Sequence, residues 1–169
     1  TCKDAGVKVI NVDNVITEDD YDLVDGIIAS DNEQLGYLSG QWVAENHPDG
    51  ANILTVHLQT AESCIINVDG FWKGIKDNAK DPDKYVDAQI VEGEGSTETS
   101  FNVVSDALQA NDDIDVIYCI NDTSALGAVQ AVEDAGKTGQ IDILGKDGAP
   151  IGKHAIKDGT MVQSSAQRP

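Results

Sequence analysis

Short polar segments follow most of the apolar runs in this sequence, and their side chains are mainly carboxylates and carboxamides. A carboxylate accepts several hydrogen bonds, and a carboxamide both donates and accepts, so such a set suits a ligand with several hydroxyl groups. A hydrogen bond to a charged group contributes roughly 1.5–3 kcal/mol, so a few of them can orient a small neutral ligand. The polar residues that follow apolar runs are Asp13, Asn14, Gln59, Thr60, Glu62, Asn121, Asp122, Lys146 and Asp147, with the segment EGEGS.

Each of these residues also has a structural explanation. Asp122 or Thr123 is expected to cap the helix that follows, which is worth ~1 kcal/mol, and Asp147-Gly148 is a common turn dipeptide. Catalytic motifs are absent: GEGSTE lacks the third glycine of a dinucleotide loop, and AGKTG lacks the first glycine of a phosphate loop. No G-x-S-x-G segment or Cys–His arrangement occurs either. We therefore predict a protein that is not an enzyme, with no catalytic residue and no cofactor.

Composition and charge exclude several functional classes. The chain has 169 residues, of which 40% are hydrophobic, as expected for a compact globular domain. Its formal net charge of −19 repels nucleic acids and anionic membrane surfaces. The three cysteines form no C-x-x-C pair, and the three histidines are widely separated. Neither a disulfide framework nor a metal site is therefore expected.

Apolar runs typical of β-strands alternate with helical patterns along the chain. The strands are predicted, in order, at VKVINV, GIIAS, ANILTVHL, YVDAQIV, IDVIYCI, QIDILG and TMVQSSA. Helices are predicted over about residues 32–46 and 64–79, around residues 101–108, in a segment that stops at Gly136, and in a short one ending at Gly159. Parallel strands need crossover connections, which helices supply. The pattern thus predicts an α/β fold, an open, doubly wound, mainly parallel sheet with helices on both faces.

Several segments together make the chain resemble the ribose-type periplasmic sugar-binding proteins, the solute receptors of bacterial ABC transporters. These segments are VINVDN, IIASDNEQLGYLSGQWV, VDGFWKGI, DIDVIYCINDTSALGAVQAV, ILGKDGAP and AIKDGTMVQSSAQRP. Members of this family have two similar lobes joined by three crossings, with the ligand between the lobes. The resemblance implies that residues 1–14 are the last strand of a missing N-terminal lobe. Residues 15–162 would then form the C-terminal solute-binding lobe, and residues 163–169 a hinge strand that returns to the missing lobe.

The resemblance also implies which residues bind the ligand. These are Asp13, Asn14, Asn67, Asn121, Asp147 and Gln167. Asn121 would hold the ligand while Asp122 or Thr123 caps the helix, and Gln167 lies in the final A-Q-x-P motif. Ribose binders have arginine at the positions of Asn14 and Asn67, and asparagine cannot copy the bidentate geometry of arginine. The expected ligand is therefore a different sugar, a polyol or another small polar solute. In open parallel sheets ligands bind beyond the carboxyl ends of the strands, and we expect the side chains of Asp13, Asn121, Asp147 and Gln167 to converge on one crevice there.

The function that the resemblance implies is that of a receptor lobe outside the cytoplasm, periplasmic or lipid-anchored. It would capture a sugar or polyol and deliver it to an ABC permease. An alternative with the same fold is the effector-binding domain of a lactose-repressor-type regulator, against which the acidic charge argues. An enzyme built on a flavodoxin-like sheet is a third reading, and the failed catalytic motifs argue against it.

The apolar run VKVINV would lose its cover if the N-terminal lobe is missing. Fully burying such a side chain is worth roughly 1.5–3 kcal/mol, and an open strand edge invites pairing with another chain. We therefore expect a homodimer of this chain, built through residues 7–12 and 161–167.

Overall fold

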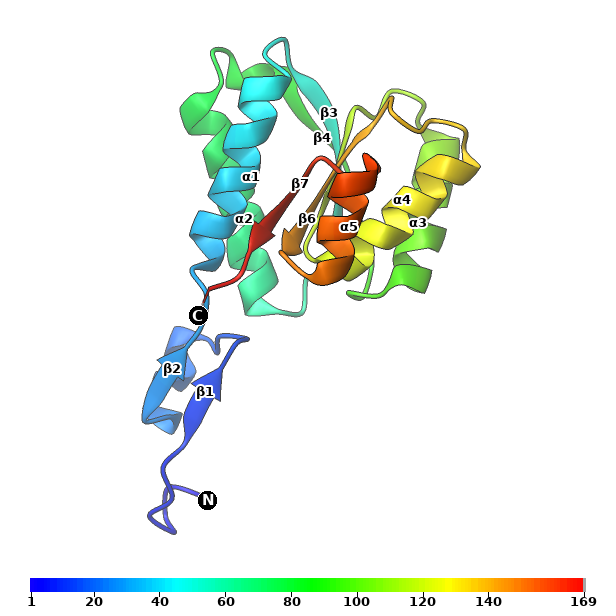
Figure 1. Cartoon of the computed structure of the whole chain (residues 1–169). Coiled ribbons are helices and arrows are strands. Elements are labelled where there is room, and N and C mark those ends of the chain that lie inside the picture. Colours follow the sequence, from blue (N-terminus) through cyan, green and yellow to red (C-terminus); the bar gives the residue numbers. More distant parts are fainter. Residues whose placement is uncertain (169) are drawn as a thin grey trace.

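The computed structural model describes residues 1–168 and consists of a large α/β lobe and a small two-stranded unit (Figure 1). The lobe contains a five-stranded sheet in which every neighbouring pair is parallel, in the order β4-β3-β5-β6-β7. Its strands are β3 (Ala51–His57), β4 (Tyr85–Glu92), β5 (Val116–Cys119), β6 (Asp142–Asp147) and β7 (Gln163–Ala166). The predicted open parallel sheet is confirmed.

Helices cover both faces of this sheet, as the alternating pattern predicts. On one face lie α1 (Asn32–Asn46) and α2 (Glu62–Asn78), and on the other lie α3 (Thr97–Ala110), α4 (Asp122–Asp134) and α5 (Pro150–Asp158). Successive strand residues point to opposite faces, so each face has its own apolar core. Ile117 packs in the core under α3 and α4, whereas Tyr118 packs in the core under α1 and α2.

The contact between α1 and α2 is unusually close, because glycines on both helices remove the side chains that would separate them. A Cβ atom at Gly36 would overlap the carbonyl oxygen of Asn67, and one at Gly40 would overlap that of Phe71. A Cβ atom at Gly70 or Gly74 on α2 would likewise overlap a carbonyl oxygen of α1. Glycines four residues apart lie on one face of a helix, so the two backbones pack directly against each other.

The segment that links β5 to α4 differs from the prediction. Asn121 itself caps α4, because its Oδ1 accepts a hydrogen bond of 2.7 Å from the backbone N–H of Ser124. The expectation that Asp122 or Thr123 caps this helix is wrong. Asp122 is instead 1% exposed, and its carboxylate accepts hydrogen bonds from the Ala149 N–H, at 2.7 Å, and from the Ser164 hydroxyl, at 2.6 Å.

Two glycines leave the space that the Asp122 carboxylate occupies. A Cβ atom at Gly145 or at Gly152 would lie 2.5 Å from atoms of this carboxylate. Asp122 thereby joins α4 to the turn after β6 and to β7. Burial raises the pKa of Asp122, and its hydrogen bonds from Ser164 and Ala149 oppose that rise.

The small unit consists of β1 (Ile10–Val12) and β2 (Gly26–Ile28), paired in parallel, with a 3₁₀ helix η1 (Glu18–Leu23) between them. Residues 26–28, predicted to belong to the larger lobe, thus pair with β1 and not with the five-stranded sheet. Residues 163–166 of the predicted hinge strand form the edge strand β7 of the large sheet. Pro169, the last residue of that predicted segment, lies outside the described residues.

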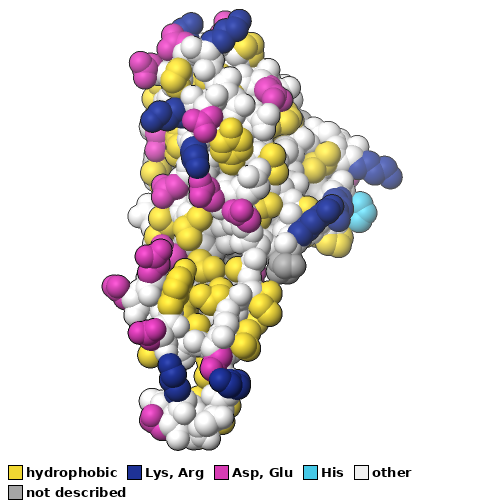
Figure 2. All heavy atoms as spheres, turned by 90° about the vertical axis from the view of Figure 1, so that its left-hand side faces the viewer, with side chains coloured by type: hydrophobic (Ala, Val, Ile, Leu, Met, Phe, Trp, Pro, Cys, Tyr) yellow, Lys and Arg dark blue, Asp and Glu magenta, His cyan; other side chains and the backbone are white. Residues whose placement is uncertain are grey.

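Large apolar side chains are exposed on the small unit. Figure 2 shows hydrophobic side chains gathered on this narrow part of the molecule. The residues are Val7, Ile10, Val12, Tyr21, Leu23 and Ile28, each 45–62% exposed. A two-stranded sheet has no second layer to pack against, so its apolar faces stay in water.

The α1–α2 contact predicts that Gly40→Ala destabilises the protein. Alanine raises helix propensity by ~1 kcal/mol, but its methyl group collides with the backbone of α2 at Phe71, which cannot move without shifting the whole helix. Overpacking of this kind costs ~1–3 kcal/mol or more, so the free energy of unfolding should fall. Urea denaturation measures it, with the exposed α1 residue Gln34→Ala as the control. A Gly40→Ala variant as stable as Gln34→Ala would contradict the close contact.

The burial of Asp122 predicts a pH-dependent difference between the wild type and Asp122→Asn. Asparagine keeps the shape of aspartate and can still accept from Ala149, while its amide donates to Ser164. The pKa of Asp122 in the folded protein lies above the unfolded value of ~3.9. The contribution of this carboxyl group to the free energy of unfolding is therefore complete only below the unfolded pKa. This contribution is lost as the pH rises through the folded pKa.

The wild type should therefore lose stability relative to Asp122→Asn as the pH is raised from about 4. Urea denaturation across the acid range measures the difference, and the exposed Asp158→Asn is the control. A difference that grows in favour of the wild type as the pH rises would show that hydrogen bonds outweigh burial at this carboxylate.

Candidate ligand-binding site

The carboxyl ends of the five parallel strands lie at one edge of the lobe, the edge that faces the small unit (Figure 1). β5 pairs with β6, and β6 pairs with β7, so the polar residues that end these strands come from neighbouring strands. Asp147 ends β6, and Asn121 follows β5 by two residues. Gln167 directly follows β7. The structure thus brings these three residues to the same edge.

Asp147 and Gln167, at the ends of β6 and β7, are hydrogen-bonded to each other at this edge. Gln167 Nε2 donates a hydrogen bond of 2.6 Å to Asp147 Oδ1, and Gln167 Oε1 accepts one of 3.3 Å from the Ser30 hydroxyl. Burial raises the pKa of Asp147, while the hydrogen bond from Gln167 and the charge of Lys146 lower it. Ser30 lies in the link between the small unit and α1, so it ties this link to the pair. No feature of the sequence around Ser30 predicts that contact.

The backbone at Asp147 is held in a conformation that few residues adopt. Its φ is +116°, and that of Gly148 is +65°. A Cβ atom at residue 148 would lie 2.7 Å from the Ala166 Cβ, so this turn passes directly against β7. The strained turn and the glycine together place the Asp147 carboxylate beside Gln167.

The Asn121 side chain supports the fold and also keeps hydrogen-bonding groups free. Its Oδ1 caps α4, and its Nδ2 donates a hydrogen bond of 3.3 Å to the Gly95 carbonyl oxygen. A carboxamide offers two N–H donors and two acceptor lone pairs, so one donor and one lone pair stay available. The side chain is half-buried at the edge.

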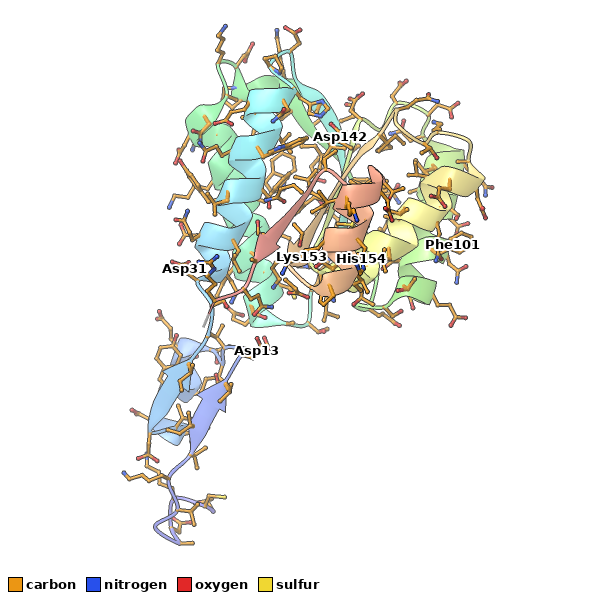
Figure 3. The ribbon with its side chains drawn as sticks, viewed as in Figure 1. Asp13, Asp31, Phe101, Asp142, Lys153 and His154 are labelled. Carbon is orange, nitrogen blue, oxygen red and sulfur yellow. The ribbon has the colours of Figure 1, made fainter. Side chains whose placement is uncertain are left out.

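Asp13 and Asn14 approach the same edge from the small unit. Figure 3 shows Asp13 beyond β1, in the space between the small unit and the lobe. Its charge also raises the pKa of Asp147, which places the two carboxylates within electrostatic reach of each other. Asn14 Oδ1 accepts a hydrogen bond of 2.6 Å from the hydroxyl of Ser63 in α2.

Asn67 does not lie at this edge surface. It is fully buried, its Oδ1 accepts a hydrogen bond of 2.6 Å from the Tyr118 hydroxyl, and its Nδ2 donates one of 3.1 Å to the Asn32 carbonyl oxygen. The resemblance implies that Asn67 contacts the ligand. In the structure its amide group instead makes hydrogen bonds that join α2 to α1 and to β5. The close packing of α1 on α2 covers this face of α2, which the sequence alone did not reveal.

Lys146 belongs to the edge, as its place after an apolar run predicts, but it is not among the residues that the resemblance implies bind the ligand. It is 5% exposed, and its Nζ donates a hydrogen bond of 3.3 Å to Asn32 Oδ1. The signal that could have found it is its place directly before Asp147, in the same motif. Buried lysines are rare, because burying a charge is costly unless it is compensated.

Other features of the described part of the chain point to no second chemistry. Within residues 1–168, no cluster of histidine, cysteine, aspartate or glutamate side chains could hold a metal ion. Among the helices described, none is long and apolar enough to cross a bilayer. A groove of about 600 Å³ lies between α3 and α4, lined by Phe101 and Leu108 among others, away from the carboxyl edge.

Comparison with known proteins places the chain among periplasmic binding proteins. The family model described as "Periplasmic binding protein domain" matches residues 1–169. The ribose import binding protein of Salmonella typhimurium is 29% identical over 166 residues, which cover 98% of this chain and 53% of that protein. The chain thus spans about half the length of this relative.

Solved structures of solute-binding proteins are similar to this chain in fold. A solute-binding protein of an ABC transporter from Burkholderia multivorans has a TM-score of 0.88 and 26% identity, covering 98% of this chain and 58% of that one. Another from Actinobacillus succinogenes, with bound D-allose, has a TM-score of 0.84 and 25% identity, covering 95% of this chain and 57% of that one. The family model, the relative and both structures match the lobe and the small unit together, and the chain belongs to the periplasmic binding protein domain family.

Proposed function

We propose that the chain is a solute-binding lobe that captures a small polyhydroxylated ligand, a sugar or polyol, for uptake by an ABC transporter. The observation that carries this proposal is the Asp147–Gln167 pair at the carboxyl edge. Among residues 1–168, Asp147 Oδ2 accepts no hydrogen bond, so it is free for a ligand hydroxyl. Asn121 offers a donor and an acceptor beside it.

The relatives support the sugar class. One is named for ribose import, and a structural neighbour holds D-allose. This chain spans about half of that relative, so a second lobe would supply the opposite wall of the site. We place residues 1–28 in that second lobe, because β2 pairs with β1. We place the crossing between the lobes at residues 29–31, where Ser30 donates a hydrogen bond to Gln167.

The proposed receptor binds its ligand without transforming it and works outside the cytoplasm. Its partner is a membrane permease that accepts the ligand from the closed receptor. The polar groups of this edge face outward, as expected if the ligand binds between two lobes. One lobe alone is half of a cleft and leaves much of the ligand in water.

The chain by itself would also expose the apolar faces of the small unit, so we propose that it forms a homodimer through residues 7–12 and 161–167. Val7, Ile10 and Val12 are each at least 50% exposed, and covering them removes apolar area from water. The short strand β1 also leaves one edge unpaired, since it bonds only to β2.

Asp147 should be needed for sugar binding by the chain. Losing half the contacts of a micromolar site leaves roughly millimolar affinity, so weak binding is expected for this chain alone. Asp147→Asn replaces an ionised acceptor and should raise the Kd on the order of ten-fold or more. NMR titration with D-allose and D-ribose measures the Kd.

Lys157-Asp158-Gly159 repeats the sequence of Lys146-Asp147-Gly148 on the exposed end of α5, so Asp158→Asn is the matched control. Equal Kd values for both variants would remove Asp147 from the site.

Light scattering tests the proposed dimer. The whole chain should have twice the mass expected for one copy, and a version lacking residues 1–12 should have the mass of a single copy, because the exposed apolar strand is gone. Circular dichroism checks that the shortened chain keeps its helices. A whole chain that stays monomeric at high concentration would refute the dimer.

A further inference from the structure

Ser30 lies in the link of residues 29–31, which joins the small unit to the lobe between the end of β2 and the start of α1. Its side chain is buried, with 7% exposed. Figure 1 shows the segment after β7 beside this link. Two hydrogen bonds join the link to that segment. The Ser30 hydroxyl oxygen accepts one of 3.1 Å from the Arg168 backbone N–H, and the hydroxyl group donates one of 3.3 Å to Gln167 Oε1.

The direction of these hydrogen bonds follows from the groups that make them. A backbone N–H can only donate, so the Ser30 oxygen accepts from Arg168. The single hydrogen of the hydroxyl group is then available for Gln167 Oε1. At the other end of the amide group, Gln167 Nε2 donates to Asp147 Oδ1, and a carboxylate only accepts. Ser30 and Asp147 therefore favour the same orientation of the Gln167 amide group.

This orientation decides where Gln167 can offer a hydrogen bond to a ligand. A primary amide has two N–H donors, and the hydrogen bonds described for residues 1–168 use one of them, toward Asp147. The second donor lies in the same plane, so its direction is set once the plane is fixed. The bond to Asp147 alone holds one end of the amide group and leaves the plane free to turn. The Ser30 hydroxyl holds the other end.

We propose that Ser30 is a positioning residue of the candidate site, which orients the Gln167 amide group and couples it to the link between the small unit and the lobe. A rotation of the link displaces the Ser30 hydroxyl relative to Gln167 Oε1. Because coupling between two sites is reciprocal, a ligand that bonds to Gln167 also favours one orientation of the link. This inference rests on the binding function proposed above and adds a coupling between that site and the link.

A second polar contact between the small unit and the lobe provides a matched control. Asn14 Oδ1 accepts a hydrogen bond of 2.6 Å from the Ser63 hydroxyl in α2. Among residues 1–168, neither of these side chains bonds to Gln167. Ser63→Ala therefore loosens the small unit but leaves the Gln167 amide group with both of its partners. Ser30→Ala removes one of those partners.

The first test needs no ligand. NMR relaxation of the isotope-labelled chain gives the order parameter of the Gln167 side-chain amide group. This order parameter should fall in Ser30→Ala, because the amide plane is then held at one end only. It should keep the wild-type value in Ser63→Ala and in Ser30→Thr, which retains a hydroxyl group. Ser30→Cys, whose thiol is a weak donor, replaces Ser30→Ala if the alanine variant does not keep the amide spectrum of the folded chain.

The second test uses NMR titration with D-ribose and D-allose. The sugar Kd should rise about 2- to 10-fold in Ser30→Ala, as expected for one neutral hydrogen bond. In a Gln167→Ala background Ser30→Ala should change the Kd no further, because Ser30 acts through Gln167. Bound sugar should also shift the backbone amide signals of Ala29 and Asp31 in the wild type, and shift them less in Ser30→Ala.

The outcomes separate this inference from the proposed function. A Gln167 amide group as rigid in Ser30→Ala as in the wild type, or loosened equally by Ser63→Ala, overturns the positioning role. A Kd that rises by the same factor with and without Gln167 shows that Ser30 acts through the fold, and overturns it too. If the wild type binds neither sugar, the binding function fails, and the order parameters still decide whether Ser30 positions Gln167.

Discussion

A single buried carboxylate, that of Asp122, holds together the elements that carry the candidate site. It accepts hydrogen bonds from Ala149, in the turn after β6, and from Ser164 in β7, while it starts α4. Burying a carboxylate is costly, so it persists only where donors satisfy it. Asp147 and Gln167 lie on the same two segments, β6 with its turn and β7. This interaction therefore helps to position both residues of the proposed site.

The second constraint is the direct backbone contact of α1 and α2. It fixes where both helices begin, and hence where Asn32 and the first turn of α2 meet the carboxyl edge. It also buries Asn67, which bridges Tyr118 and the backbone at Asn32. The edge thus combines the carboxylate of Asp147 with the buried ammonium group of Lys146, the residue before it.

The small unit has a different physical character. Two short strands cannot cover their own apolar side chains, whereas the lobe encloses two complete cores. That contrast agrees with a chain that spans about half of its relatives. The lobe covers its apolar side chains with its own helices, whereas a two-stranded unit offers no second layer to cover its apolar faces.

The sequence by itself determined the fold class and most element boundaries, because the periods of apolar residues and the order of strands and helices are local properties. It also determined that Asn121, Asp147 and Gln167 meet at one edge, since parallel strands end together. Tertiary structure alone decided that Asn121 and not Asp122 caps α4, because both side chains can reach the first turn and only packing buries one of them. It likewise decided that Asn67 is buried and that Lys146, expected at the end of its strand, is buried there with Asn32 as its hydrogen-bond partner. Burial depends on which faces of distant elements meet, and no local pattern in the sequence records that.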